Sequence, residues 1–140
     1  MTRRQCRKHI FKLLYEVQFH QDEPIKDLVD TYLENFKEEE EELTENDYRF
    51  ILGEIEGVCK VQAQIDQDIE TAVKGWKLNR LSKVDLAILR LAVYEITCVP
   101  DIPTSVSINE AVELAKKYSQ PAARAFINGV LGALAPREEA

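Results

Sequence analysis

The opening segment of the chain carries side chains that could bind a polyanion. Its first fifteen residues hold no acidic group and five basic ones, namely Arg3, Arg4, Arg7, Lys8 and Lys12. Phe11 and Tyr15 share a helical row with Arg4 and Lys8, because these four positions are spaced i, i+4, i+7 and i+11. Guanidinium groups contact phosphates, and flat rings stack on unpaired bases. This pattern predicts a helical face that binds single-stranded nucleic acid.

Other interpretations of this segment stay open. The basic face could be solvated, with Phe11 packed in the core. It could pair with an acidic protein or a second copy, since 13 of the 18 Lys and Arg residues and all 25 Asp and Glu residues lie after Tyr15. A membrane surface would need more exposed apolar area. A mitochondrial presequence is disfavoured, because the segment is not Ser-rich and its apolar residues suit a core.

The sequence gives little support for catalysis. His9 and His20 lie outside any Cys–His or Ser–His signature, and the H-E-x-x-H, C-x-x-C and Gly-rich phosphate-binding motifs do not occur. The three cysteines are odd in number and widely spaced, which argues against a disulfide scaffold and a zinc site. We therefore expect a binding protein and not an enzyme, without metal or cofactor, in a reducing cytoplasm.

Polar residues and glycines inside apolar helical patterns are the remaining candidates for chemistry. Asp85, Arg90 and Glu95 could form a catalytic triad, but buried ion pairing or a partner contact is the favoured interpretation. A glycine inside a helix costs about 1 kcal/mol relative to alanine. We therefore expect close contacts between helices at two pairs of such glycines, Gly53 with Gly57 and Gly129 with Gly132.

Helical periodicity runs through almost the whole chain, and no segment shows the alternation typical of a strand. We expect an all-α protein with about seven helices and a single domain over residues 1–140. No apolar run approaches the roughly 18 residues that a membrane span needs. The first helix is expected to bury one stripe of side chains, formed by Cys6, Ile10, Leu13, Leu14 and Val17.

Capping residues predict where the next helices begin. Pro24 suits the first turn of a second helix. Thr44 and Asp47 are spaced as in a capping box before a third. That third helix either continues to about residue 73 or is broken near Gln62, and Gly75 would end it.

Similar signals divide the second half of the chain. Ser82 and Asp85 predict the N-terminus of a helix over residues 84–96 that is apolar on nearly all sides and therefore central. Ser107 and Glu110 form an S-x-x-E capping box. Pro121 is expected to start the last helix. The acidic run 38–42 is expected to be a solvated helix end or loop, because adjacent like charges repel.

Four segments, in order along the chain, carry recognisable motifs. The first is R-R-x-x-R followed by LLYEVQF, at Arg3, Arg4, Arg7 and residues 13–19. The second is W-x-L-x-R-L-x-x-V-D-x-A-I-L-R-L-A-x-Y-E at residues 76–95. The third, V-x-I-N-E-A-V-E-L-A-K-x-Y, spans 106–118, and F-I-N-G-V-L spans 126–131. Each helix motif is weak alone, but the ordered set is specific and resembles the NusB family of bacterial transcription antitermination factors.

The resemblance implies two small helical bundles packed against each other. It also implies binding to the boxA element of ribosomal RNA transcripts and a heterodimer with NusE, a protein of the small ribosomal subunit. That complex would join NusA, NusG and RNA polymerase. Some relatives form homodimers that hide the RNA surface, so a homodimer stays open. The related domain also occurs fused to RNA methyltransferases, but this chain has no room for that catalytic domain.

Matching positions imply roles for individual residues. The expected RNA contacts are Arg3, Arg4, Arg7 and Lys8, together with Phe126 and Asn128 from the F-I-N-G-V-L motif. The expected NusE side comprises Tyr15, Asp85 and Arg90. Two positions depart from the family pattern: Gln5 stands where some relatives carry arginine, and Gly132 stands where an acidic residue is usual. The first departure predicts weaker RNA binding.

Overall fold

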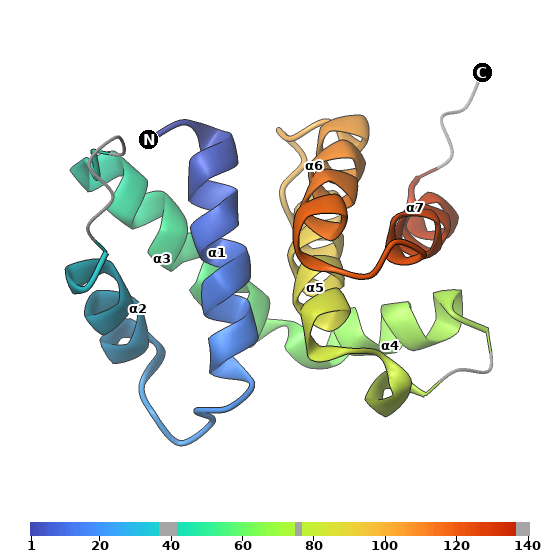
Figure 1. Ribbon diagram of the computed structural model, residues 1–140, viewed down its shortest axis with the longest axis horizontal. Coiled ribbons are helices and arrows are strands. Elements are labelled where there is room, and N and C mark those ends of the chain that lie inside the picture. Colours follow the sequence, from blue (N-terminus) through green and yellow to red (C-terminus); the bar gives the residue numbers. More distant parts are fainter. Residues whose placement is uncertain (37–41, 75–76, 137–140) are drawn as a thin grey trace. The chain divides into compact units, whose positions relative to one another are not determined.

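The computed structural model describes residues 1–36, 42–74 and 77–136, which form seven α-helices, one short 3₁₀ helix and no strand (Figure 1). The predicted all-α class is confirmed. The chain divides into two compact units, Met1–Lys60 and Val61–Ala140. The first contains α1 (Arg3–Val17), α2 (Ile25–Glu34) and α3 (Glu45–Lys60). The second contains α4 (Gln62–Ala72), η1 (Leu78–Arg80), α5 (Lys83–Cys98), α6 (Thr104–Tyr118) and α7 (Ala123–Leu134).

In the first unit α1 packs against both α2 and α3. The predicted stripe on α1 is confirmed for four side chains that are at most 4% exposed, Cys6, Ile10, Leu13 and Leu14. Val17, at the end of the helix, is half-buried. Leu28, Val29 and Leu33 of α2 and Ile51, Ile55 and Val58 of α3 complete this core.

Two capping boxes fix the starts of α1 and α3. The predicted box at α3 is confirmed, since the Asp47 amide donates to Thr44 Oγ1 at 3.1 Å and the Thr44 amide donates to Asp47 Oδ2 at 3.0 Å. At α1, Thr2 Oγ1 accepts from the Gln5 amide at 3.1 Å, and Gln5 Oε1 accepts from the Thr2 amide at 2.7 Å. Each box satisfies two backbone donors that a helix would otherwise leave unpaired.

Of the two predictions for the middle of the chain, the break near Gln62 is confirmed. α3 ends at Lys60 and α4 begins at Gln62. Val61 lies between them with φ −112° and ψ 18°, outside the helical region. The break coincides with the boundary between the two units.

In the second unit α5 is central, as its apolar composition predicted, and it packs against α4, α6 and α7. Nine of its residues are buried. Ser82 caps it as expected, with its Oγ accepting from the Asp85 amide at 3.0 Å. Arg90 of α5 donates from Nε and Nη2 to the two carboxylate oxygens of Asp66 in α4, both at 2.9 Å. This bidentate pair joins the two helices, and it confirms the prediction of buried ion pairing for Arg90.

Two expectations about helix ends and packing are wrong. Pro103 and not Ser107 stands at the N-terminus of α6, because the amides of Val106 and Ser107 already donate to the Pro103 carbonyl. Ser107 is therefore inside the helix, buried, and its Oγ donates to Glu95 Oε1 at 3.4 Å. The predicted close contacts at Gly53, Gly129 and Gly132 are also absent, since a Cβ added at any of them meets no atom within 4 Å.

Two of the predictions concern residues that lie wholly or partly outside the described part of the chain. Residues 38–41 of the acidic run and Gly75 lie outside the described residues, while Glu42 is exposed. Pro121 precedes the first residue of α7 by two positions. Among the described residues, no helix combines the length and apolarity of a membrane span. That residues 1–140 act as one RNA-binding domain stays a prediction.

Candidate functional site

The exposed side of α1 carries a narrower basic surface than the sequence suggested. Arg4 is exposed, and Lys8, Lys12 and Tyr15 are half-exposed. These residues follow the i, i+4, i+8, i+11 row of the helix, so they lie along one side of it. We call these four residues the basic strip. Lys12 belongs to this strip because of its helical spacing.

Two residues predicted for the nucleic-acid face are buried. Phe11 is 4% exposed, so the expectation that its ring stacks on bases is wrong and the alternative that it belongs to the core is confirmed. Arg7 is 6% exposed, and the buried sector of α1 therefore includes the row Arg7, Phe11 and Leu14. An RNA contact by Arg7 stays a prediction, and it would require the side chain to become more exposed.

Arg3 lies at the start of α1 and is exposed. Its guanidinium carbon lies 3.8 Å from the centroid of the Phe50 ring of α3. This cation–π contact holds the guanidinium group over the ring, and it uses the face of the group and not the N–H donors that lie in its plane. Phe50 could not be predicted as part of this site, because no local sequence pattern links a residue of α3 to the first turn of α1.

Gln5, which stands where some relatives carry arginine, has a structural role in capping α1. Its side chain closes the capping box of α1 with Thr2. The sequence T-R-R-Q contains the signature for this box, in which Ser or Thr is followed three residues later by Glu or Gln. Gln5 therefore supports the helix that presents the basic strip.

In the second unit, Asp85 and Phe126 line one hollow of about 300 Å³. Asp85 lies in the first turn of α5, and its Oδ1 accepts from Ser119 Oγ at the C-terminus of α6. Phe126 of α7, which is half-buried, also lines the hollow. The other lining residues, which the sequence analysis missed, are Arg80, Leu81, Ser82, Gln120, Ala122 and Ala123. The hollow combines an aromatic ring, one carboxylate and one guanidinium group.

The remaining candidates lie elsewhere. Asn128 is exposed on α7 but does not line the hollow. Arg90 is 9% exposed and paired with Asp66, so its role in binding a partner stays a prediction. Asp85, Arg90 and Glu95 each contact a different residue, respectively Ser119, Asp66 and Ser107. The structure thus brings Asp85 and Phe126 together and does not assemble the triad.

The fold and these surfaces define a class of protein: an all-α binding protein with a basic helix and no assembled catalytic group among the candidate residues. Residues 4–136 match the NusB family, and the chain belongs to that family. It is 48% identical over 132 residues to the transcription antitermination protein NusB of Acetivibrio thermocellus, covering 94% of this chain and 87% of the relative. The NusB protein of Listeria welshimeri is 39% identical, covering 99% of this chain and all of the relative.

Solved structures agree with this assignment. A crystal form of T. maritima NusB matches with a TM-score of 0.84 and 35% identity, covering 96% of this chain and 91% of that one. NusB in a crystal structure of the antitermination factors NusB and NusE in complex with dsRNA matches with a TM-score of 0.76 and 26% identity. That comparison covers 96% of this chain and 97% of the other.

Proposed function

We propose that this chain is a transcription antitermination factor that binds the boxA element of ribosomal RNA transcripts through α1. The observation that carries the proposal is the basic strip, which presents three cations and a tyrosine on one side of a capped helix. Membership of the NusB family supports it, as does the solved relative crystallised with NusE and dsRNA. Phosphate contacts by Arg4, Lys8 and Lys12 would position the RNA, with Arg3 and Arg7 as further candidates.

We propose NusE as the protein partner. Tyr15 stands at the end of the basic strip and is stacked edge-to-face on Phe19, with ring centroids 5.3 Å apart. Phe19 is 54% exposed, so this aromatic pair offers apolar surface to a partner. Asp85, in the hollow of the second unit, is a further candidate contact. The complex would then join NusA, NusG and RNA polymerase in the cytoplasm, where binding alone supplies the activity and no catalytic group is needed.

The test is a titration of fluorescently labelled boxA RNA with the protein, alone and with NusE, at several salt concentrations. Three phosphate contacts predict that log affinity falls with log salt at a slope of about −2, at roughly −0.7 per contact for a single strand. Lys12→Gln should make that slope shallower by about 0.7. Lys60→Gln, which removes an exposed charge at the end of α3, is the matched control and should leave the slope unchanged.

Absence of any salt-sensitive binding, even with NusE present, would reject the proposal. Equal effects of Lys12→Gln and Lys60→Gln would reject the assignment to the basic strip, because general electrostatic attraction would then explain the binding.

The second candidate function is that of a protein-only adaptor or a homodimer. The burial of Arg7 and Phe11 favours this candidate, because it reduces the surface available to RNA. Replacing Arg4 and Lys8 by Glu should then disrupt a protein complex without changing RNA binding. The mass of the particle formed with NusE and boxA RNA, measured by light scattering, distinguishes a ternary complex from a homodimer.

A further inference from the structure

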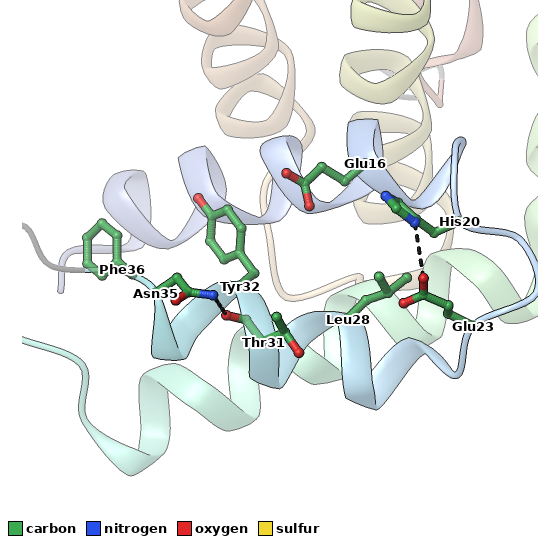
Figure 2. Close-up of a pocket in the computed structure, with 8 residues that line it drawn as sticks. All are labelled: Glu16, His20, Glu23, Leu28, Thr31, Tyr32, Asn35 and Phe36. Carbon is green, nitrogen blue, oxygen red and sulfur yellow. Dashed lines mark hydrogen bonds and ion pairs between the residues drawn. The ribbon is translucent and has the colours of Figure 1, made fainter.

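A groove between α1 and α2 lies within the first unit and has no part in the proposed RNA contact. Its volume is about 420 Å³, which is within the range of ligand-binding pockets. Figure 2 shows the lining side chains, with Glu16 coming from α1 and His20 and Glu23 from the connecting loop. Leu28, Thr31 and Tyr32 come from α2, and Asn35 and Phe36 follow its last residue. Leu28 and Tyr32 share one face of α2, because they are spaced by four residues, and Phe36, two residues after the end of that helix, also lines the groove.

A buried histidine contacts both aromatic residues that line the groove. His9 is 0% exposed, and its Nδ1 lies 2.8 Å from the Tyr32 hydroxyl. The His9 ring also packs edge-to-face on Phe36, with centroids 4.3 Å apart. A groove whose rings are already fixed loses little conformational entropy when a ligand binds. His9 is thus a positioning residue for this surface.

The rim of the groove is acidic. Glu16 and Glu23 both line it, and Figure 2 shows the Glu23 carboxylate bonded to His20, at 3.2 Å. Among the residues that the structure describes, none of those lining the groove is Lys or Arg. Residues 16–36 contain six Asp and Glu residues and a single Lys or Arg, Lys26, whose Nζ lies 2.7 Å from Asp30. The negative charge of the groove is opposite to the positive charge of the basic strip, which lies on α1.

We propose that this groove is a second docking site, for a basic peptide segment of a partner protein. The apolar stem of an arginine or lysine side chain would lie on Leu28 and the Tyr32 ring, while its cationic end reaches the Glu16 or Glu23 carboxylate. A neighbouring apolar residue of the peptide would pack near Phe36. Charge complementarity selects this occupant, because RNA and acidic peptides are repelled by the rim.

The test uses the full chain, labelled with ¹⁵N, and a decapeptide probe with two arginines and one leucine in a Gly/Ser background. Amide shifts are followed as the peptide is added. The shifts should concentrate in the last turn of α1, the connecting loop and α2. A peptide with both arginines replaced by glutamates should produce none of them.

Variants of the rim make the test specific. Glu16→Gln and Glu23→Gln should each weaken binding about threefold and together about tenfold, as expected for exposed ion pairs. Glu56→Gln, an exposed residue of α3 in the same unit, is the matched control and should leave the affinity unchanged. Tyr32→Phe, which removes the hydroxyl held by His9, should weaken binding while the spectrum away from the groove stays the same.

Several results would overturn the proposal. These are the absence of shifts at the groove up to 1 mM peptide, equal binding of the glutamate peptide, or equal effects of Glu56→Gln and the rim variants. Concentration-dependent shifts at the groove without any peptide would identify a second copy as the occupant and would overturn it too. None of these measurements involves RNA or NusE, so they are independent of the proposed function.

Discussion

The pair formed by Arg90 and Asp66 allows a stringent test, because sequence resemblance assigns Arg90 to a partner while the structure engages it inside the second unit. Two N–H groups of Arg90 donate to both oxygens of Asp66 at 2.9 Å. The side chains are only 10% and 19% exposed. Such a bidentate, largely desolvated pair couples α5 to α4 far more strongly than a surface ion pair would.

The expected cost depends on which partner is removed. Asp66→Ala leaves the guanidinium of Arg90 buried without its carboxylate, which should lower the free energy of unfolding by about 3 kcal/mol. Arg90→Met keeps much of the buried stem and leaves Asp66, the more exposed partner, to water, so about 1.5 kcal/mol is expected. The double variant has no unpaired buried charge and should lose only about 2 kcal/mol. The coupling between the two sites is then about 2.5 kcal/mol.

The assay is urea unfolding of the parent protein, the two single variants and the double variant, monitored by circular dichroism at 222 nm. The slope of the unfolding free energy against urea concentration is then compared among these four proteins. An equal slope indicates that the free energies describe the same transition. A coupling free energy below about 0.5 kcal/mol would mean that Arg90 and Asp66 contribute independently to the stability of the protein. That result would contradict the strong pairing expected between them.

The same variants decide the role of Arg90 in binding. If the guanidinium acts only through Asp66, folded Arg90→Met should bind NusE within about twofold of the parent protein. Asp85→Asn serves as the comparison, since Asp85 lines the hollow and is the other candidate for that partner. A loss of tenfold or more for folded Arg90→Met would instead support a direct partner contact, and the structural assignment would be incomplete.

Three further predictions concern stability. Gly53→Ala should raise the free energy of unfolding by about 1 kcal/mol in a urea titration, because the new methyl group meets no atom within 4 Å and alanine favours a helix; no gain would contradict this. Ser82→Ala should lower it by about 1 kcal/mol through loss of the cap of α5, whereas Ser82→Asp should retain most of the stability. Hydrogen bonds from the Thr44 amide and then the Met1 ammonium lower the pKa of Asp47 from 3.8 to about 2. This contribution, about 2 kcal/mol, is present above pH 4 and is lost as pH falls towards 2, so Asp47→Asn should flatten that part of the pH profile.

Local features of the fold could be predicted because they depend on residues a few positions apart. The capping box at Thr44 and the cap at Ser82 are examples, and the sequence pattern allows either a break near Gln62 or a continuous helix there. The failure at Ser107 has the same origin, since two start signals compete within one turn. Pro103 begins the helix first, and the Ser107 hydroxyl then finds Glu95 on α5, which no local rule could have indicated.

The candidate site was predictable only in part. The helical row explains the basic strip, but burial of Arg7 and Phe11 depends on the packing of α1 and not on its own sequence. The hollow in the second unit joins Asp85 to Phe126 across 41 positions of the chain. Sequence spacing carries no information about such a meeting unless a known structure supplies it.

The helices, most of their caps, the segregation of charge and the family could be read from the amino-acid sequence, because periodicity, capping and motif order are properties of neighbouring residues. Packing between helices established that Arg7 and Phe11 are buried while Lys12 is half-exposed, and that Arg90 pairs with Asp66. It also placed the buried His9 in contact with Tyr32 and Phe36 of the acidic groove. These outcomes depend on contacts between separate helices, where burial and pairing are decided.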